Sequence, residues 1–262
     1  MLLSLCLTAL AVPAPATAAL PHAPVSATAE SQFAAAKPVR LMAEDKVELS
    51  ATYFAPKKMK AKNPAVILIH DAGQDQDQLE ELAKNFQKKG FAALTIDLRG
   101  HGKSAVEALD WSKADEAGKK SMWAHAPKDV AAAAGWLGER LEVHASNLTL
   151  VGMGSAVGLA ARHAIEDSSA QALVLVDPSE ETYGFDIDKD LAELAGLPTL
   201  IVAPKGERKK AAAMQKTAHD ANDGYEYIEI SVLKSKREDI LEDKRLKSST
   251  SSWTRDKVNK KD

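Results

Sequence analysis

The sequence predicts an α/β protein with a doubly wound, mostly parallel sheet. Short runs of almost purely apolar residues are typical of strands that helices cover on both faces. Segments with the apolar period of a helix lie between these runs. Strands that alternate with helices in this way form a parallel sheet through right-handed crossovers. The buried strands are expected at residues 65–69, 91–96, 148–151, 172–176 and 199–202.

Two further strands and the connecting helices complete the predicted domain. Apolar residues alternate with polar or small ones between residues 47 and 53, which predicts an antiparallel strand with one buried face. A last strand is expected at residues 225–232. Only about twenty residues separate the strands expected at residues 172–176 and 199–202, which leaves room for a short helix but not for a cap domain. The main helices are expected at residues 79–89, 128–141, 155–164 and 211–221.

The first 18 residues have the features of a secretory signal peptide. Met1–Val12 is an apolar run too short to span a bilayer comfortably, and Ala16-Thr-Ala18 offers a cleavage site of small residues. We therefore expect export to the periplasm or the medium. The start of the run has no lysine or arginine, which a signal peptide usually carries there, so a disordered alanine-rich terminus stays open as the alternative. Residues 19–38 are predicted to be a flexible linker rich in Ala and Pro, and residues 39–247 to be the domain.

The C-terminal residues differ from the domain in composition. Residues 248–262 are rich in serine and lysine, which predicts a polar, charged tail. A helix around Trp253 and Val258 that covers the sheet edge stays open as the alternative. Cys6 is the only cysteine and lies in the predicted signal peptide, so the mature chain has neither a disulfide nor a cysteine-based zinc site.

Length and charge restrict the partners of the protein. A chain of 262 residues holds one α/β domain of ordinary size. Its net charge of −3, without a basic stripe, argues against a nucleic-acid partner. We expect no membrane association beyond the signal peptide, no cofactor and no metal site. The partners that remain are a small-molecule ester or other ligand, and a protein that the sequence does not identify.

The segment of residues 148–164 is the centre of the functional prediction. A short strand runs through a glycine turn into an alanine-rich helix, which is the arrangement that presents a nucleophilic serine in a G-x-S-x-G turn. Here the motif falls on Gly152-Met-Gly-Ser-Ala156. Gly154 then stands where the serine is expected, and the turn is a degenerate form of the motif.

A second register of this turn places Ser155 at its apex. The residues two before and two after the apex are then Met153 and Val157, which are bulky where a tight turn against strand and helix needs small side chains. Sterics therefore favour the register with Gly154 at the apex. In that register Ser155 is the first residue of the helix and offers its backbone N–H.

Two more segments match motifs of a known family. His70-Asp-Ala-Gly73 matches an H-x-x-G turn, and Asp97-Leu-Arg-Gly-His-Gly-Lys-Ser104 matches D-x-R-G-x-G-x-S at every defined position. Together with the turn at Gly154 they resemble the α/β-hydrolase superfamily, especially small capless bacterial members near the dienelactone hydrolases and esterases. The resemblance covers about residues 45–230 and implies about eight strands with the active centre at their carboxyl ends. It also implies that the second segment organises the scaffold and that His101 is not a catalytic base.

The resemblance implies a catalytic triad of nucleophile, acid and histidine in that order along the chain. Ser155 is the candidate nucleophile. Glu207 and Asp177 are the candidate acids, each following a buried strand, although each also fits a solvated loop carboxylate. No histidine follows His219, and lysines such as Lys234 stand where the family has Gly-x-x-His. A lysine base would need a pKa lowered by about three units through burial, and this stretch is too charged to be buried.

The family builds its oxyanion hole from backbone N–H groups, which here belong to Ala72 and Ser155. Asp71 replaces the family's usual glycine and brings negative charge to the place where an anion would bind. His70 and Asp71 are expected to line the pocket. The acidic cluster nearby lacks the spacing of a calcium loop, so we interpret it as a helix N-terminus with acidic residues. Its members are Asp71, Asp75, Asp77, Glu80 and Glu81.

These observations support two main hypotheses. In the first, which we prefer, the protein is an exported pseudoenzyme that has lost its triad and binds a ligand or serves as a scaffold. In the second, it is a carboxylesterase-like serine hydrolase for small esters that uses Ser155, with Glu207 or Asp177 and an unexpected base. A third hypothesis is a structural envelope protein whose cleft is filled by its own side chains.

Overall fold

The computed structural model of the chain describes residues 36–57 and 62–258. The predicted signal peptide and residues 19–35 of the predicted linker lie outside the described residues. The first described residue, Ala36, already belongs to a β-strand.

The first strand begins three residues earlier than the predicted domain. β1 (Ala36–Met42) pairs antiparallel with β2 (Glu48–Phe54), so the predicted linker boundary after Pro38 is wrong. β1 lies at the edge of the sheet and is exposed along most of its length. An edge strand needs few apolar residues and accepts a proline, which is why this segment resembles a linker in the sequence.

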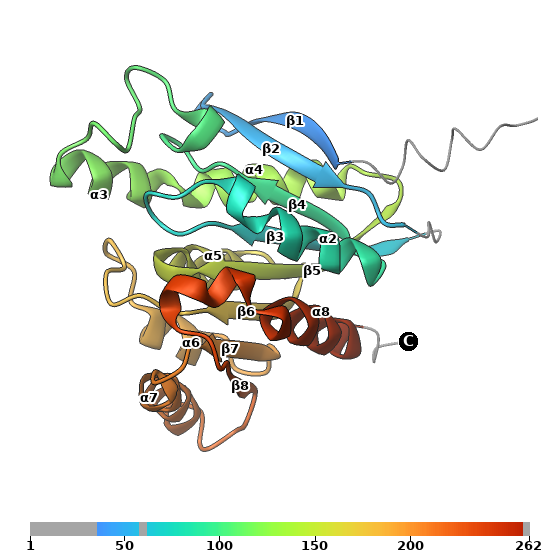
Figure 1. Ribbon diagram of the computed structural model, residues 1–262, viewed down its shortest axis with the longest axis vertical. Helices are drawn as coiled ribbons and strands as arrows, with labels where there is room; N and C mark the ends of the chain where they lie inside the picture. The colour runs from blue at the N-terminus through green and yellow to red at the C-terminus, as the bar shows by residue number, and fades with distance from the viewer. Residues whose placement is uncertain (1–35, 58–61, 259–262) are drawn as a thin grey trace, which may run out of the picture.

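A sheet of eight strands runs through the molecule in the order β1-β2-β4-β3-β5-β6-β7-β8 (Figure 1). β1 and β2 are antiparallel to their neighbours, and all pairings from β3 to β8 are parallel. The predicted doubly wound, mostly parallel sheet of an α/β-hydrolase is therefore confirmed. The parallel strands are β3 (Asn63–Ile69), β4 (Ala92–Ile96), β5 (Val143–Met153), β6 (Ala170–Val176), β7 (Thr199–Ala203) and β8 (Ile228–Val232).

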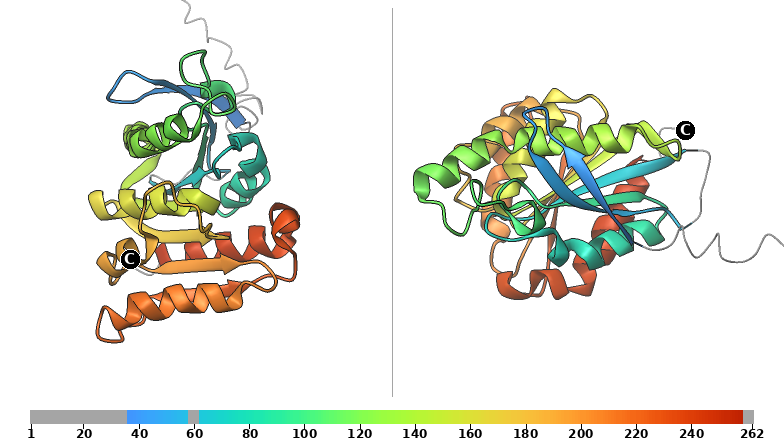
Figure 2. Two further views of the ribbon diagram at one scale, coloured as in Figure 1. Left: turned by 90° about the vertical axis from the view of Figure 1, so that its left-hand side faces the viewer. Right: turned by 90° about the horizontal axis from the view of Figure 1, so that it is seen from above.

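Helices cover both faces of the sheet, as the two views of Figure 2 show. α2 and α8 pack together on one face, and α4, α5, α6 and α7 form a row on the other. The connection after β6 carries only the short α6, and no cap domain occurs in the described residues. None of the helices described is long and apolar enough to cross a membrane. The helices are α2 (Glu80–Lys88), α3 (Glu116–His125), α4 (Pro127–Gly138), α5 (Val157–Glu166), α6 (Ile187–Glu193), α7 (Arg208–Asp220) and α8 (Lys244–Val258).

The C-terminal segment is a packed helix rather than the predicted tail. α8 buries Leu246 and Val258 against the same hydrophobic cluster as α2. Two of its three buried hydroxyls are satisfied inside the helix: Thr250 donates to the carbonyl of Leu246 at 2.5 Å and Ser251 to that of Lys247 at 2.8 Å, whereas the buried hydroxyl of Thr254 has no hydrogen-bond partner among the described residues. Ser and Thr side chains that bond back to the preceding turn can be buried without a further partner. The prediction of a tail is therefore wrong for residues 248–258, and residues 259–262 lie outside the described part.

The turn after β4 is held by its own side chains. The Asp97 carboxylate accepts the backbone N–H groups of Gln76 (2.8 Å) and Lys103 (3.0 Å). Ser104 donates its hydroxyl to the carbonyl of Asp97 and accepts the N–H of Ser50, each at 2.8 Å. These bonds join three segments of the chain around one buried carboxylate, which fits the scaffold role that the resemblance implies.

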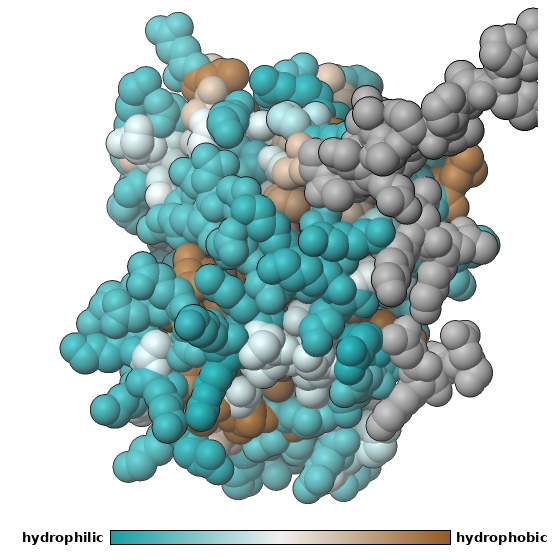
Figure 3. Space-filling model, turned by 45° about the vertical axis from the view of Figure 1, so that its right-hand side comes forward, coloured by the Kyte–Doolittle hydropathy of each residue, from teal (hydrophilic) through white to brown (hydrophobic). Residues whose placement is uncertain are grey.

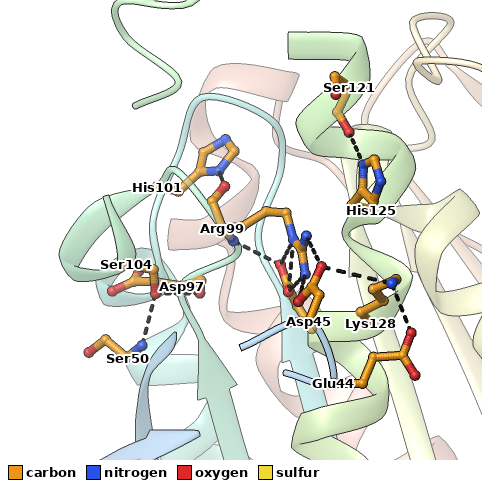
Figure 4. A network of polar contacts seen from close by, with 11 residues as sticks. Glu44, Asp45, Ser50, Asp97, Arg99, His101, Ser104, Ser121, His125 and Lys128 are labelled. Atoms are coloured by element: carbon orange, nitrogen blue, oxygen red, sulfur yellow. Dashed lines mark hydrogen bonds and ion pairs between the residues drawn. The ribbon is translucent and has the colours of Figure 1, made fainter. Parts of the chain in front are cut away.

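Arg99, in the same turn, lies in a buried ionic network (Figure 4). Its guanidinium donates to Asp129 at 2.7 Å and to Asp45 at 2.8 Å. The Asp129 side chain is fully buried at the start of α4, and it also accepts the backbone N–H of Arg99. The hydrogen bonds from Arg99 hold the pKa of the Asp45 carboxyl below its usual range. The network connects the turn after β4 to α4 and to the β1–β2 hairpin.

We predict that Arg99→Met lowers the free energy of unfolding by about 3–5 kcal/mol, because it leaves the buried Asp129 carboxylate without its counter-ion. Chemical denaturation at neutral pH measures this loss. Arg40→Met is the matched control, since the Arg40–Glu48 pair is exposed and should contribute at most about 1 kcal/mol. Equal losses in the two variants would show that the Arg99 network is not a stabilising element.

Candidate functional site

The turn after β5 has the register that sterics favoured in the sequence. Gly154 has a φ of +56°, the left-handed conformation of a turn apex. Gly152 is equally constrained, since a Cβ there would lie 2.6 Å from the carbonyl oxygen of Ala156. Ser155 follows the apex, has no left-handed conformation and is only 3% exposed. The position of the elbow nucleophile is therefore occupied by a glycine.

The two predicted oxyanion-hole N–H groups point at one atom. The Oδ1 oxygen of Asp71 accepts the backbone N–H of Ala72 at 2.8 Å and that of Ser155 at 2.7 Å. An enzyme of this fold uses such a pair of donors for the oxyanion of its reaction intermediate. The predicted negative charge is thus bound directly to both donors. Asp71 is not part of the acidic helix start, where Asp75 instead caps the chain by accepting the N–H of Asp77.

The absence of a side chain at Gly154 makes room for this carboxylate. A Cβ at position 154 would lie 2.1 Å from Cγ of Asp71 and 2.2–2.3 Å from both of its oxygens. Contacts this short between non-bonded atoms do not occur. A side chain at position 154 and the observed position of the Asp71 carboxylate therefore exclude each other.

A cleft of about 340 Å³ lies over the ends of β5 and β6. Asp177 follows β6 with a left-handed φ of +47°, and its Oδ2 pairs with Nε of Arg237 at 2.9 Å. Burial raises the pKa of the Asp177 carboxyl, the charge of Arg237 opposes this shift, and the charges of Glu207 and Asp71 add to it. The cleft is lined by Asp71, Gln74, Gln78, Met153, Gly154, Asp177, Ser179, Arg237, Glu238, Ile240 and Leu241.

The three candidate catalytic residues are not assembled into a triad geometry. Only Asp177 lines the cleft; Ser155 is buried below it, and Glu207 stands at the N-cap position of α7. Within the described residues, no histidine ring is hydrogen-bonded to any of the three. Arg237 was missed by the sequence prediction, because it is one of many charged residues after β8. The signal that would have indicated Arg237 is its place after the last strand, where the family has its histidine.

His70 does not line the cleft as expected, because its ring is 1% exposed and both nitrogens are used by the backbone. Its Nδ1 donates to the carbonyl of Asp71 at 2.7 Å, and its Nε2 accepts the N–H of Leu98 at 3.1 Å. The ring centroid of His101 lies 5.0 Å from that of His70. Its Nδ1 donates to the carbonyl of Arg99, and its Nε2 accepts the N–H of Gly73. Burial lowers the pKa of each ring to about 4. Both rings are neutral at physiological pH and have no free nitrogen for proton transfer.

The remaining candidates for a base or a metal ligand are also engaged or dispersed. His219 is half-buried, and its Nε2 accepts the N–H groups of Tyr227 (3.3 Å) and Ile228 (3.2 Å). It thereby fixes the entry into β8. In the described part of the chain, no three histidine, aspartate or glutamate side chains converge as metal ligands.

Comparison with known families agrees with this fold. The family model for serine aminopeptidase, S33, matches residues 60–216, more than half of the chain. The chain belongs to this family. Membership of the S33 family confirms the resemblance to α/β-hydrolases that the motifs implied. The match ends inside α7, so β8 and Arg237 lie beyond it.

Solved structures of the same fold include two hydrolases with low sequence identity. An esterase of Pyrococcus furiosus matches with a TM-score of 0.67 and 14% identity. The match covers 89% of the present chain and 94% of the esterase chain. A putative dienelactone hydrolase of Klebsiella pneumoniae has a TM-score of 0.64 and 15% identity over 86% and 98% of the two chains. At such identity the likeness concerns the fold. No curated protein matches the chain in sequence.

We predict that the rings of His70 and His101 titrate near pH 4 in the folded protein and near 6.5 in the unfolded chain. Between these two pH values the unfolded chain binds protons that the folded protein does not. The contribution of the neutral rings to the free energy of unfolding is therefore fully present above about pH 6.5 and is lost as the pH falls toward 4. The loss is up to about 1.4 kcal/mol per pH unit for each ring. NMR titration of the ring protons, with the urea-unfolded chain as control, measures both midpoints. A folded midpoint near 6.5 would contradict the buried, neutral state.

Proposed function

We propose that this S33-family protein is a ligand-binding pseudoenzyme whose cleft does not hydrolyse esters or peptides by a serine mechanism. The observation that carries the proposal is the pair formed by Gly154 and Asp71. The apex of the elbow has no hydroxyl, and a carboxylate is bound to both N–H groups that would stabilise the oxyanion. The site therefore lacks both the attacking group and the free N–H donors that a serine mechanism uses.

The proton-transfer side of the cleft supports the same proposal. A serine hydroxyl becomes a nucleophile only when an adjacent base takes its proton. Here Arg237 pairs with Asp177 at the end of β6. A guanidinium is protonated at all physiological pH values and accepts no proton, so this pair is no substitute for a histidine and its carboxylate.

The ligand that the cleft favours is a small polar molecule. Most of its lining side chains are charged or carry amide or hydroxyl groups, while Met153, Ile240 and Leu241 supply apolar surface. On the face shown in Figure 3, hydrophobic residues form small patches separated by hydrophilic ones. A protein that docks through an apolar surface needs a larger continuous patch. No such patch is seen on this face, and the polar lining of the cleft supports a small polar ligand.

Hydrolysis of small esters is the second candidate function, and family membership favours it. The S33 family is a family of hydrolases, and esterases are among the solved structures of the same fold. These likenesses favour hydrolysis over a loss of activity, whereas the residues in the cleft favour the loss. In this second function Ser155 would be the nucleophile, Asp177 or Glu207 the acid, and the base a residue outside the positions the family uses.

We predict that a fluorophosphonate probe does not label the purified domain, because no serine in the cleft is activated. Ser155→Ala and Ser179→Ala are the matched variants, one at the elbow and one on the cleft wall. A cooperative thermal melt shows that the protein tested is folded. Labelling that disappears in either variant would contradict the proposal, and labelling lost only in Ser155→Ala would establish the hydrolase function.

Export is a further part of the proposal and depends on the N-terminal sequence alone. The apolar run Met1–Val12 and the small residues at Ala16-Thr-Ala18 support it. We predict that the full chain expressed in a bacterium is recovered outside the cytoplasm with Ala19 as its first residue, as N-terminal sequencing would show. Recovery of the uncleaved chain from the cytoplasm would contradict export.

A further inference from the structure

The oxyanion hole of this protein is assembled by two neighbouring strands. β3 and β5 are parallel neighbours, and their register places Ile69 opposite Gly152. The chain therefore leaves both strands at the same edge of the sheet, and the N–H groups of Ala72 and Ser155 converge from separate loops. Both reach Oδ1 of Asp71, at 2.8 and 2.7 Å. Two backbone donors fixed by a sheet form a preorganised anion site.

Asp71 has the properties of a bound anion in that site. Its carboxylate takes part in no ion pair within the described residues, so its contacts there are the two N–H groups and the cleft that it lines. The cleft side of the carboxylate is next to Gly154, whose missing side chain leaves the space that the carboxyl group fills. A second anion could not reach the same donors without displacing this one.

We infer that the N–H groups of Ala72 and Ser155 form a carboxylate-binding site that the chain keeps occupied with its own Asp71 side chain. Asp71 acts as a tethered ligand that closes the site to free carboxylates, and Gly154 is the residue that permits it. This goes beyond the proposed function, since it names what occupies the site when the cleft holds no ligand. It is tested without any measurement of turnover.

Removal of the tethered carboxylate should open the site to acetate. We predict that acetate binds Asp71→Ala at least about tenfold more tightly than the natural chain, because hydrogen bonds to a charged group are restored. NMR titration with acetate follows the binding, and the amide signals of Ala72 and Ser155 should move most. Asp71→Ser serves the same purpose if Asp71→Ala does not give folded protein.

The matched control removes an acidic side chain from the same loop without vacating the site. Asp77 is exposed, and its side chain contacts neither N–H group. Asp77→Ala should bind acetate as weakly as the natural chain. An equal gain in Asp77→Ala would mean that the effect is general electrostatics, and no gain in Asp71→Ala would mean that the two N–H groups are not an anion site. Either result overturns the inference.

A double-mutant cycle tests the contact between Asp71 and Gly154 in the protein without added ligand. Gly154→Ala should lower the ratio of folded to unfolded protein in both backgrounds. The decrease should be about tenfold larger when Asp71 is present than in the Asp71→Ala background. Gly90→Ala is the control, because Gly90 also has a positive φ but has open space around it. Its cost should be the same in both backgrounds. Equal costs for Gly154→Ala in both backgrounds would show that the carboxylate does not occupy this position.

Discussion

The cleft depends on one constraint, the parallel register of β3, β5 and β6. Ile69 lies opposite Gly152, and Met153 lies opposite Val176, so three loops leave the sheet at one level. This places Asp71, Gly154 and Asp177 side by side, although they are far apart in the sequence. The loops are also joined directly, since the N–H of Ser179 donates to the carbonyl of Gly154 at 3.1 Å. A shift of one residue in either register would separate the carboxylate from its two donors.

The scaffold around the cleft is independent of the residue at the elbow. Asp97 and Ser104 hold the turn after β4, and Arg99 connects that turn to α4 through the buried Asp129. His70 and His101 are two buried, neutral rings in contact with each other, and each is held by one carbonyl and one N–H. None of these contacts involves Gly154 or Ser155. This is why the chain can keep the fold and the motifs of a hydrolase family while its elbow carries a glycine.

The buried strands and the elbow register could be predicted from the sequence, because both follow from local rules. A short apolar run such as residues 65–69 is typical of a strand covered on both faces, and Met153 and Val157 are too large to flank a tight apex. The edge strand β1 was missed because it is mostly exposed and has few apolar residues. The helix α8 was only the less favoured alternative, because its serine and threonine residues give no clear hydrophobic pattern. The role of Asp71 needed the register of two strands, which no local pattern contains. The sequence indicated the negative charge at this place but not the bonds that hold it.

The mutual exclusion at Gly154 makes the elbow epistatic with the loop after β3. A serine introduced at position 154 would meet the Asp71 carboxylate before it could meet a substrate, so that substitution is harmful in the present background. A side chain at the apex is accommodated when residue 71 is small and neutral, or when the Asp71 side chain rotates out of this place and gives up its two hydrogen bonds. The effect of a change at either position therefore depends on the residue at the other.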